Sequence, residues 1–285
     1  MLTLRIIIYS ILIIFLTMSC RQSADKPETS TADSTDTSDT TARVTVDTTK
    51  FIFDPENEFL GLGVPAFGDL DSMISRRKIR ALVPYTHLYY YIDGKERRGI
   101  AFEALNLFEK SLNKQLHFKP HRVRIIFIPV NRSQVIPLLR DGYADLAYAG
   151  MTITEERKKL VDFSVPSITG LKEIIVGGAT SPKLNTLADL AGQEVYLRVG
   201  SSYETAARKL SDSLERTGLP PIVIKPVDPY LETEDILELV NSGVIPFSAT
   251  VEDVARIWSK VLDSLVLYDK MPLASNISYG WVFRK

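Results

Sequence analysis

The sequence predicts an α/β fold made of two lobes joined by a hinge. Short apolar runs typical of buried strands alternate with segments whose apolar residues recur at helical intervals. The connections between them are short, which is typical of parallel βαβ units. A second run of the same kind begins near residue 173, so two lobes fit better than one. The length of 285 residues and the 45% hydrophobic content are sufficient for two cores.

The first series of elements extends from residue 69 to residue 149. Pro84 ends its first strand, and a tyrosine-rich segment ends at the turn Asp93-Gly94. The expected strands are 79–83, 123–128 and 144–149, and the expected helices are 69–78, 100–112 and 133–140.

The second series has the same alternation of apolar strands and amphipathic helices. The expected strands are 173–176, 194–198 and 222–224, and the expected helices are 202–214, 233–241 and 251–261. No repeat of 20 to 50 residues is visible, which argues against a solenoid.

Charge and composition exclude several classes of function. The 34 basic and 35 acidic residues leave a formal charge of -1, so the chain lacks the net positive field that nucleic-acid binding needs. One cysteine and three histidines argue against a disulfide framework and against a zinc site. We therefore expect no metal, no cofactor and no nucleic-acid partner.

Residues 1–19 are typical of a lipoprotein signal peptide. Arg5 precedes an apolar run over 6–16, and the sequence Thr-Met-Ser before Cys20 resembles a bacterial lipobox. Cleavage before Cys20 would make it the lipidated N-terminus. The run is shorter than the roughly 20 apolar residues that span a bilayer. An ordinary signal peptide with an incidental cysteine, or a membrane-spanning anchor, are the alternatives.

A tether is expected to separate the lipid from the folded body. Residues 20–50 are dominated by Ser, Thr and Asp and contain no aromatic side chain. Such a segment cannot bury enough apolar surface to fold, so we expect it to be disordered. The folded body is then 51–285.

One candidate ligand contact is a basic residue that follows a strand. After the expected strand 144–149, Thr154 fits the N-cap of a helix whose first turn contains Arg157. Ligands of α/β sheets bind at such strand ends, and a guanidinium there can hold a carboxylate by two parallel hydrogen bonds. The alternative is a charged helix face in water.

A second candidate site follows the strand that ends at Arg198. Ser201 and Glu204 have capping-box spacing, so the backbone N–H groups near Ser201 and Ser202 would face the space beyond the strand. An anion could bind there. The alternative is an ordinary helix cap without a ligand.

The segment 144–164 resembles the signature of the bacterial extracellular solute-binding proteins of family 3, the amino-acid receptors of ABC importers. It contains Ala-Asp-Leu, Ala-Gly-Met-Thr-Ile-Thr and Val-Asp-Phe-Ser in order, and Leu-Ala-Asp-Leu-Ala-Gly at 187–192 and Arg-Val-Gly-Ser-Ser at 198–202 resemble later motifs of that family. The resemblance covers about 70–285. It implies that ligand contacts come from Gly150, Thr152 and Arg157 and from the loop of Ser201 and Ser202.

The family resemblance also implies a fold and its division into lobes. The fold would be like that of a type II periplasmic binding protein. The first lobe would be about 70–170 plus about 272–285, and the second about 171–271. Hinge closure would bury the ligand between them.

Two further segments resemble the N-terminal module of membrane-bound lytic murein transglycosylase F. They are 90–103, which begins with Tyr-Tyr-Ile, and 240–248. The acid that meets the ligand's amino group in the family falls here on the apolar Val251, which argues against a free α-amino acid unless Glu252 takes that role. One tyrosine of the segment after the first strand is expected to contact the ligand, and Tyr90 is our choice.

These observations predict a lipid-anchored, non-catalytic binding protein of the cell envelope, facing the periplasm or the exterior. Its ligand would be a small carboxylate-bearing molecule, an amino acid or a peptidoglycan-derived fragment. No segment resembles a lysozyme-like catalytic domain with its positioned carboxylic acid. The alternative is the sensor half of a split or truncated lytic transglycosylase. The expected partner is an importer permease or a lytic transglycosylase domain.

Overall fold

The computed structural model describes residues 63–117 and 122–285, all of which belong to one compact unit. The predicted signal peptide, the lipidation site Cys20, the tether 20–50 and the expected start of the folded body at residue 51 lie outside the described residues. They stay predictions.

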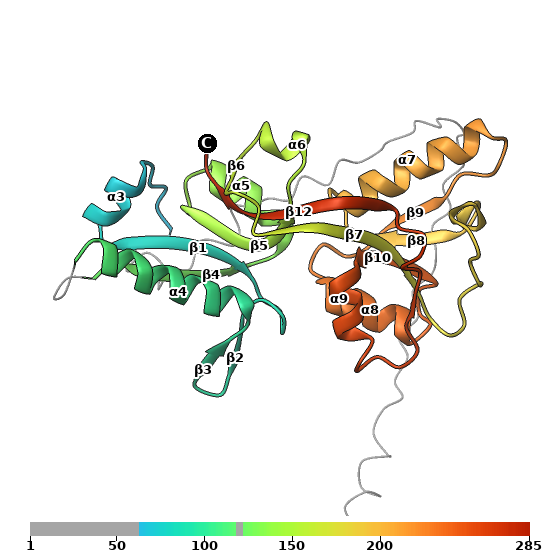
Figure 1. The fold of residues 1–285 in the computed structure, drawn as a ribbon, viewed down its shortest axis with the longest axis horizontal. Coiled ribbons are helices and arrows are strands. Elements are labelled where there is room, and N and C mark those ends of the chain that lie inside the picture. Colours follow the sequence, from blue (N-terminus) through green and yellow to red (C-terminus); the bar gives the residue numbers. More distant parts are fainter. Residues whose placement is uncertain (1–62, 118–121) are drawn as a thin grey trace, which may run out of the picture. The chain divides into compact units, whose positions relative to one another are not determined.

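The first lobe is built on three parallel strands (Figure 1). β1 (Lys78–Pro84) pairs with β4 (Arg124–Val130) on one side and with β5 (Leu146–Thr152) on the other. All residues of β1 except the first are buried, which explains why the strand is apolar apart from Lys78 and the paired Arg80. The remaining elements of this lobe are α3 (Leu70–Ser75), β2 (Tyr91–Asp93), β3 (Glu96–Arg98), α4 (Ile100–Gln115), η2 (Arg132–Gln134), α5 (Val135–Arg140), α6 (Glu155–Lys158) and β6 (Asp162–Phe163).

Two long antiparallel strands, β7 (Ile168–Gly177) and β12 (Ala274–Phe283), connect the lobes (Figure 1). They pair with each other where Leu171 faces Ile277. The end of β7 then pairs with the second lobe, whereas the end of β12 pairs with β5. With β10 (Phe247–Val251) at its second-lobe edge, one sheet of order β10-β7-β12-β5-β1-β4 therefore continues through both lobes. The lobe boundaries expected at 170–171 and 271–272 fall within β7 and just before β12.

The second lobe packs helices around β7, β10 and a separate parallel pair, β8 and β9. Its buried residues form clusters distinct from those of the first lobe, so each lobe has its own core. Its elements are η3 (Leu187–Leu190), β8 (Glu194–Leu197), α7 (Ser202–Arg216), β9 (Val223–Pro226), α8 (Thr233–Asn241), β10 (Phe247–Val251), α9 (Glu252–Trp258) and β11 (Val266–Leu267).

Most predicted elements are confirmed within a few residues, and the differences have local causes. The helix expected over 69–78 ends at Ser75 because Arg77 adopts a φ of 55°, the left-handed conformation that terminates helices. Strand β10 was not predicted. It contains Ser248 and Thr250 and follows Pro246, so its sequence does not resemble an apolar strand although all five of its residues are buried.

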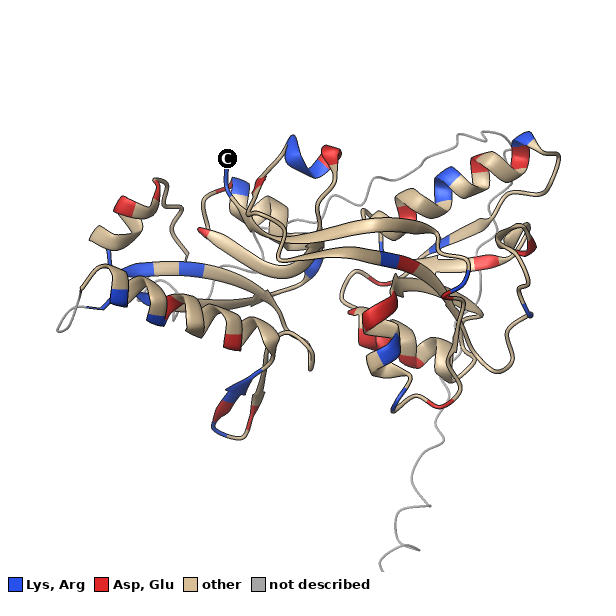
Figure 2. Cartoon of the chain, viewed as in Figure 1, with Lys and Arg blue, Asp and Glu red and all other residues tan. Residues whose placement is uncertain are grey.

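Charged residues lie mainly on the helices and on the β2–β3 hairpin, with few on the long strands (Figure 2). Both signs occur on α7, where Glu204 and Arg208 form an ion pair one turn apart. This mixture of signs agrees with the absence of a net positive field in the sequence.

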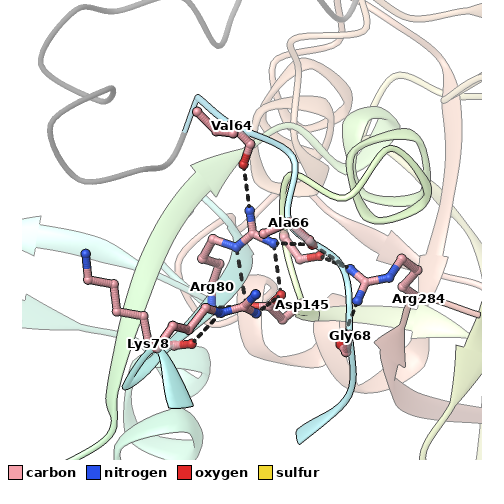
Figure 3. Close-up of polar contacts among 9 residues, drawn as sticks. Val64, Ala66, Gly68, Lys78, Arg80, Asp145 and Arg284 are labelled. Atoms are coloured by element: carbon pink, nitrogen blue, oxygen red, sulfur yellow. Dashed lines mark hydrogen bonds and ion pairs between the residues drawn. The ribbon is translucent and has the colours of Figure 1, made fainter. Parts of the chain in front are cut away.

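The buried carboxylate of Asp145 binds two arginines of the first lobe (Figure 3). The side chain of Asp145 is fully buried, and its two oxygens accept hydrogen bonds from the backbone N–H of Arg80 at 2.8 Å and from the Arg80 guanidinium at 2.9 Å. Arg76 adds a third charge at 2.5 Å. Asp145 thus forms ion pairs with two guanidinium groups at once.

The same region holds the segment 64–68, which we call the N-terminal strap (Figure 3). Arg80 donates to two strap carbonyls at 3.2 and 2.9 Å, and Arg284 donates to a third at 2.9 Å. The ring of Phe67 lies against Gly142, where an added Cβ would approach it to 2.6 Å. The strap is therefore fixed to the first lobe rather than to the second.

Replacing Asp145 should strongly destabilise the protein. Asp145→Ala leaves the buried Arg80 charge without its carboxylate, so we expect the free energy of unfolding to fall by about 3–5 kcal/mol. Urea unfolding followed by circular dichroism measures this, with Asp212→Ala on the exposed face of α7 as the control. A loss below about 1 kcal/mol, the value of a surface pair, would contradict this account.

Candidate ligand-binding site

A cavity of about 80 Å³ lies where loops of the two lobes meet. Strands β5 and β8 both end at its wall, the position at which α/β sheets bind ligands. Side chains of the segment after β1, of α8 and of α9 complete the wall. It contains five of the residues predicted as ligand contacts: Gly150, Thr152, Arg157, Ser201 and Ser202.

Arg157 reaches from the first lobe to the second. Its helix begins as predicted, because the Thr154 hydroxyl accepts a hydrogen bond from the Arg157 N–H at 3.2 Å. The guanidinium donates to the Thr152 carbonyl at 2.9 Å and, across the lobes, to the Gly200 carbonyl at 3.3 Å.

The charge of Arg157 is not matched by an ion-pair partner. Within residues 63–117 and 122–285, no carboxylate lies at ion-pair distance from its guanidinium. Burial lowers the pKa of Arg157, and the more distant charge of Glu173 opposes this shift. A guanidinium that is half-buried, bonded only to neutral carbonyls and exposed to a cavity is suited to bind an anion.

The second lobe offers the N-terminus of α7 to the same cavity. The Ser201 hydroxyl accepts a hydrogen bond from the Glu204 N–H at 3.1 Å, as the predicted cap requires, whereas the Glu204 carboxylate accepts from the Gly200 N–H at 2.7 Å. Among the described residues, the N–H groups of Ser202 and Tyr203 have no acceptor. These two amides and the positive end of the helix favour an anion.

A chain of hydroxyl groups joins the two lobes beside Arg157. Thr152 Oγ1 lies 3.1 Å from Ser202 Oγ, and Ser202 donates to the Glu173 carboxylate at 2.5 Å. Glu173 is buried on β7, and burial raises its pKa. Thr152 and Ser202 are therefore close enough to contact one small ligand together.

Gly150 is required by packing at the cavity wall. Its φ is 55°, and a Cβ added there would lie 1.8 Å from the hydroxyl oxygen of Tyr89. The glycine thus admits the Tyr89 side chain. A direct contact of Gly150 with ligand stays a prediction.

Tyr90 and Glu252 lie outside the cavity wall. The Tyr90 ring is buried in the first-lobe core, stacked on Phe127 at 5.4 Å, and Tyr89 takes the place beside the cavity. Glu252 pairs instead with Lys172 at 3.4 Å and with Arg256 at 2.7 Å. We therefore move the proposed tyrosine contact from Tyr90 to Tyr89 and withdraw Glu252 as the acid of the site.

An ion pair between the lobes was not foreseen. Arg132 at the start of η2 donates from Nε to Glu232 at 2.8 Å, and the pair is largely buried. The Arg132 guanidinium also lies 4.6 Å from the centre of the Tyr89 ring and donates to the Ala149 carbonyl. Glu232 lies 3.7 Å from Arg198, so it faces two arginines.

A weak signal for Arg132 was available in the sequence. It follows the strand that ends at Val130, the same strand-end position that identified Arg157. The acidic segment 232–235 gave no signal of this kind, because only the fold brings it to Arg132, 100 residues earlier.

A second cavity of about 600 Å³ adjoins the first. Both walls include Thr152, Arg157 and the loop 200–202, so the side chain of Arg157 stands between the two. The second cavity is also lined by Glu173 and by apolar residues of β12, and it contains none of the tyrosines at the first.

Within the described ranges, no cluster of three histidine, cysteine or acidic side chains is arranged to hold a metal ion. The described helices are also too short or too polar to cross a bilayer. The absence of a metal or cofactor from the function stays a prediction.

Comparison with known proteins identifies related chains. The sequence profile of the bacterial extracellular solute-binding proteins, family 3, matches residues 81–266. Membrane-bound lytic murein transglycosylase F of Aeromonas hydrophila is 24% identical over 76% of this chain, which spans 40% of that relative's length. The L-cystine-binding protein of Escherichia coli is 24% identical over 52% of this chain and 54% of the relative.

A solved structure supports the fold assignment. An ancestral arginine-binding protein bound to arginine is 26% identical, covers 74% of this chain and 85% of its own, and has a TM-score of 0.59. The prediction of a type II periplasmic-binding-protein fold is confirmed.

The buried carboxyl group of Glu173 should make stability depend on pH. Its pKa is raised above the ordinary value of 4.5, so the folded chain holds this proton more tightly than the unfolded chain. The protonated Glu173 therefore stabilises the folded state. This contribution is fully present below pH 4.5 and is lost as pH rises through the pKa of Glu173 in the folded chain. Glu173→Gln keeps a hydrogen-bond acceptor for Ser202 without this dependence.

We therefore expect Glu173→Gln to gain stability relative to the wild type as pH rises from 4.5 to neutrality. Urea midpoints across this range provide the measurement. Glu215→Gln, at an exposed position of α7, should show a constant difference from the wild type. A constant difference for Glu173→Gln as well would refute the assignment.

Proposed function

Because the chain belongs to the bacterial extracellular solute-binding proteins, family 3, we propose that it binds a small carboxylate-bearing solute in the 80 Å³ cavity between its lobes. The observation that carries this proposal is Arg157, which faces the cavity with no carboxylate at ion-pair distance in the described part of the chain. Burying such a charge is costly unless a counter-charge arrives. A ligand carboxylate supplies that counter-charge.

The groups around the cavity have distinct roles in this proposal. Arg157 holds the carboxylate from the first lobe, exchanging its bond to the Gly200 carbonyl for bonds to the ligand. The free N–H groups of Ser202 and Tyr203 donate to the same carboxylate from the second lobe. Because the ligand contacts both lobes, binding favours their closure about β7 and β12. The protein itself performs no chemical step.

An amino acid is the ligand class that the wall fits best. Two related proteins carry names that specify cystine and arginine as ligands. Of the residues in the wall, Glu234 is the carboxylate, and it can face an ammonium group although it also accepts from the His87 N–H at 2.9 Å. Glu234 thus replaces Glu252 as the proposed partner of an α-amino group.

Arg157→Ala should weaken ligand binding more than about tenfold. Losing one partner of a buried charge pair costs about 2–5 kcal/mol of binding free energy. Calorimetry on the purified full-length chain in mild detergent, with a panel of amino acids and muropeptides, measures the affinities. Lys158→Ala, an exposed neighbour on the same helix, should bind like the wild type.

Equal affinities of Arg157→Ala and the wild type would overturn the assignment of Arg157 as a ligand contact.

The ligand panel also distinguishes two candidate functions. If an amino acid is the tightest ligand, the result favours a protein that captures solutes and delivers them to an importer permease. A muropeptide as the tightest ligand favours the second candidate function, a sensor module acting in peptidoglycan turnover with a lytic transglycosylase. The similarity to transglycosylase F over 76% of the chain favours this second function.

We further propose that the chain is held to a membrane of the cell envelope by a lipid on Cys20. The supporting observations are the apolar run and the Thr-Met-Ser-Cys sequence at the N-terminus. Cys20→Ser should move the protein from the membrane fraction to the soluble fraction or leave it uncleaved, and mass spectrometry of the N-terminal peptide reports the lipid. An unmodified Cys20 in the wild-type protein would refute the anchor.

A further inference from the structure

A second arginine of the cavity wall, Arg198, has unused hydrogen-bond donors. Arg198 follows β8 directly and is only 9% exposed. Nη2 donates to the Thr233 hydroxyl at 3.2 Å, and in the described part of the chain the buried Nε has no partner. A buried donor without an acceptor costs about 1–3 kcal/mol, so this arrangement indicates that an acceptor is missing.

The nearby carboxylate of Glu232 does not satisfy Arg198. Glu232 accepts from the Arg132 Nε at 2.8 Å and from the Arg132 backbone N–H at 3.2 Å. Its distance to Arg198 Nη2 is 3.7 Å, beyond hydrogen-bond length. Burial lowers the pKa of Arg198, with the Glu232 charge acting against this shift.

A second unsatisfied group lies in the same wall. Thr250 is 1% exposed, and its hydroxyl has no hydrogen-bond partner among the described residues. Both Thr250 and Arg198 line the 80 Å³ cavity, Thr250 from β10 and Arg198 from the β8–α7 loop. Two buried polar side chains without hydrogen-bond partners in the described residues thus line one cavity. Such a pair is expected where a polar group of a ligand binds.

The charges of the wall favour an acidic group there. Three arginines line the cavity, Arg132, Arg157 and Arg198, against the single lining carboxylate of Glu234. Glu232 beside the wall adds one negative charge. Glu173 lines the larger cavity rather than this one, and its carboxylate accepts a hydrogen bond from Ser202. Among the residues that line this cavity, three are cationic and one is a carboxylate. A ligand with a second carboxylate matches this lining better than a zwitterion with no net charge.

We propose that Arg198 and Thr250 bind a second acidic group of the ligand, so that the site takes small solutes with two carboxylates, such as glutamate. This inference rests on the proposed function, in which Arg157 holds the first carboxylate. Arg198 is then the residue that determines specificity. Nothing in this role requires the chain to be an enzyme.

The test compares acids with their neutral amides. Calorimetry on the full-length chain in mild detergent uses L-glutamate, L-glutamine and glutarate as probes. The wild type should bind L-glutamate at least about tenfold more tightly than L-glutamine, because the amide offers Arg198 a neutral acceptor in place of a carboxylate. Glutarate, which has two carboxylates and no ammonium group, reports what Glu234 contributes.

Arg198→Gln should remove the preference for L-glutamate over L-glutamine while retaining binding of L-glutamine. A purely structural role of Arg198 would weaken both ligands equally and leave their ratio unchanged. Arg208→Gln on the exposed face of α7 is the matched control and should keep the wild-type ratio. Thermal unfolding of each variant checks that the fold is retained.

The outcomes separate this inference from the proposed function. If the wild type binds amino acids through Arg157 but does not prefer the acid, the Arg198 subsite is refuted and the proposed function stands. If Arg198→Gln keeps the preference, the subsite is also refuted. If only a muropeptide binds the wild type, the Arg198 subsite is refuted and the second candidate function is favoured. If no amino acid, dicarboxylate or muropeptide binds, both proposals fail.

Discussion

The site depends on one interaction: a guanidinium from the first lobe that donates to a backbone carbonyl of the second. Arg157 bonds to Thr152 in its own lobe at 2.9 Å and to Gly200 in the other at 3.3 Å. Both acceptors are neutral, so among the residues that the structure describes the cationic charge has hydrogen bonds but no ion-pair partner. The short helix that positions Arg157 is fixed by the Thr154 cap, and the strand before it ends at the cavity. Local backbone geometry therefore directs this charge to the gap between the lobes.

Other polar contacts between the lobes surround this interaction. The Arg132–Glu232 pair joins them at 2.8 Å, and the hydroxyls of Thr152 and Ser202 meet at 3.1 Å. Buried ion pairs contribute little net stability because desolvation offsets the attraction, so we expect the Arg132–Glu232 pair to define geometry more than to add stability. The continuous strands β7 and β12 carry the backbone connection. The two strands connect the lobes, and the polar contacts hold them close at the gap. An anion that enters the gap can therefore bind both lobes at once.

Much of this arrangement could be predicted from local sequence. Strand ends, caps and helix starts depend on neighbouring residues, and they identified Arg157, Ser201 and Ser202 correctly as residues of one cavity wall. Tyr89 and Tyr90 are consecutive, and the sequence does not reveal which of the two rings packs in the core. The proposed ligand contact therefore moves by one position, from Tyr90 to Tyr89. Glu252 is the acidic neighbour of Val251, where the family motif has its acid, and the sequence does not show that this side chain pairs with Lys172 and Arg256 instead. Arg132 was missed because its partner is 100 residues away in the sequence.

The most direct test of the central claim is a crystal structure of the chain with its tightest ligand from the calorimetric panel. We expect a ligand carboxylate about 3 Å from the Arg157 guanidinium, in place of the bond to the Gly200 carbonyl. We also expect the N–H groups of Ser202 and Tyr203 to point to the same carboxylate. A ligand bound elsewhere, with Arg157 still bonded to Thr152 and Gly200 and to nothing else, would contradict it.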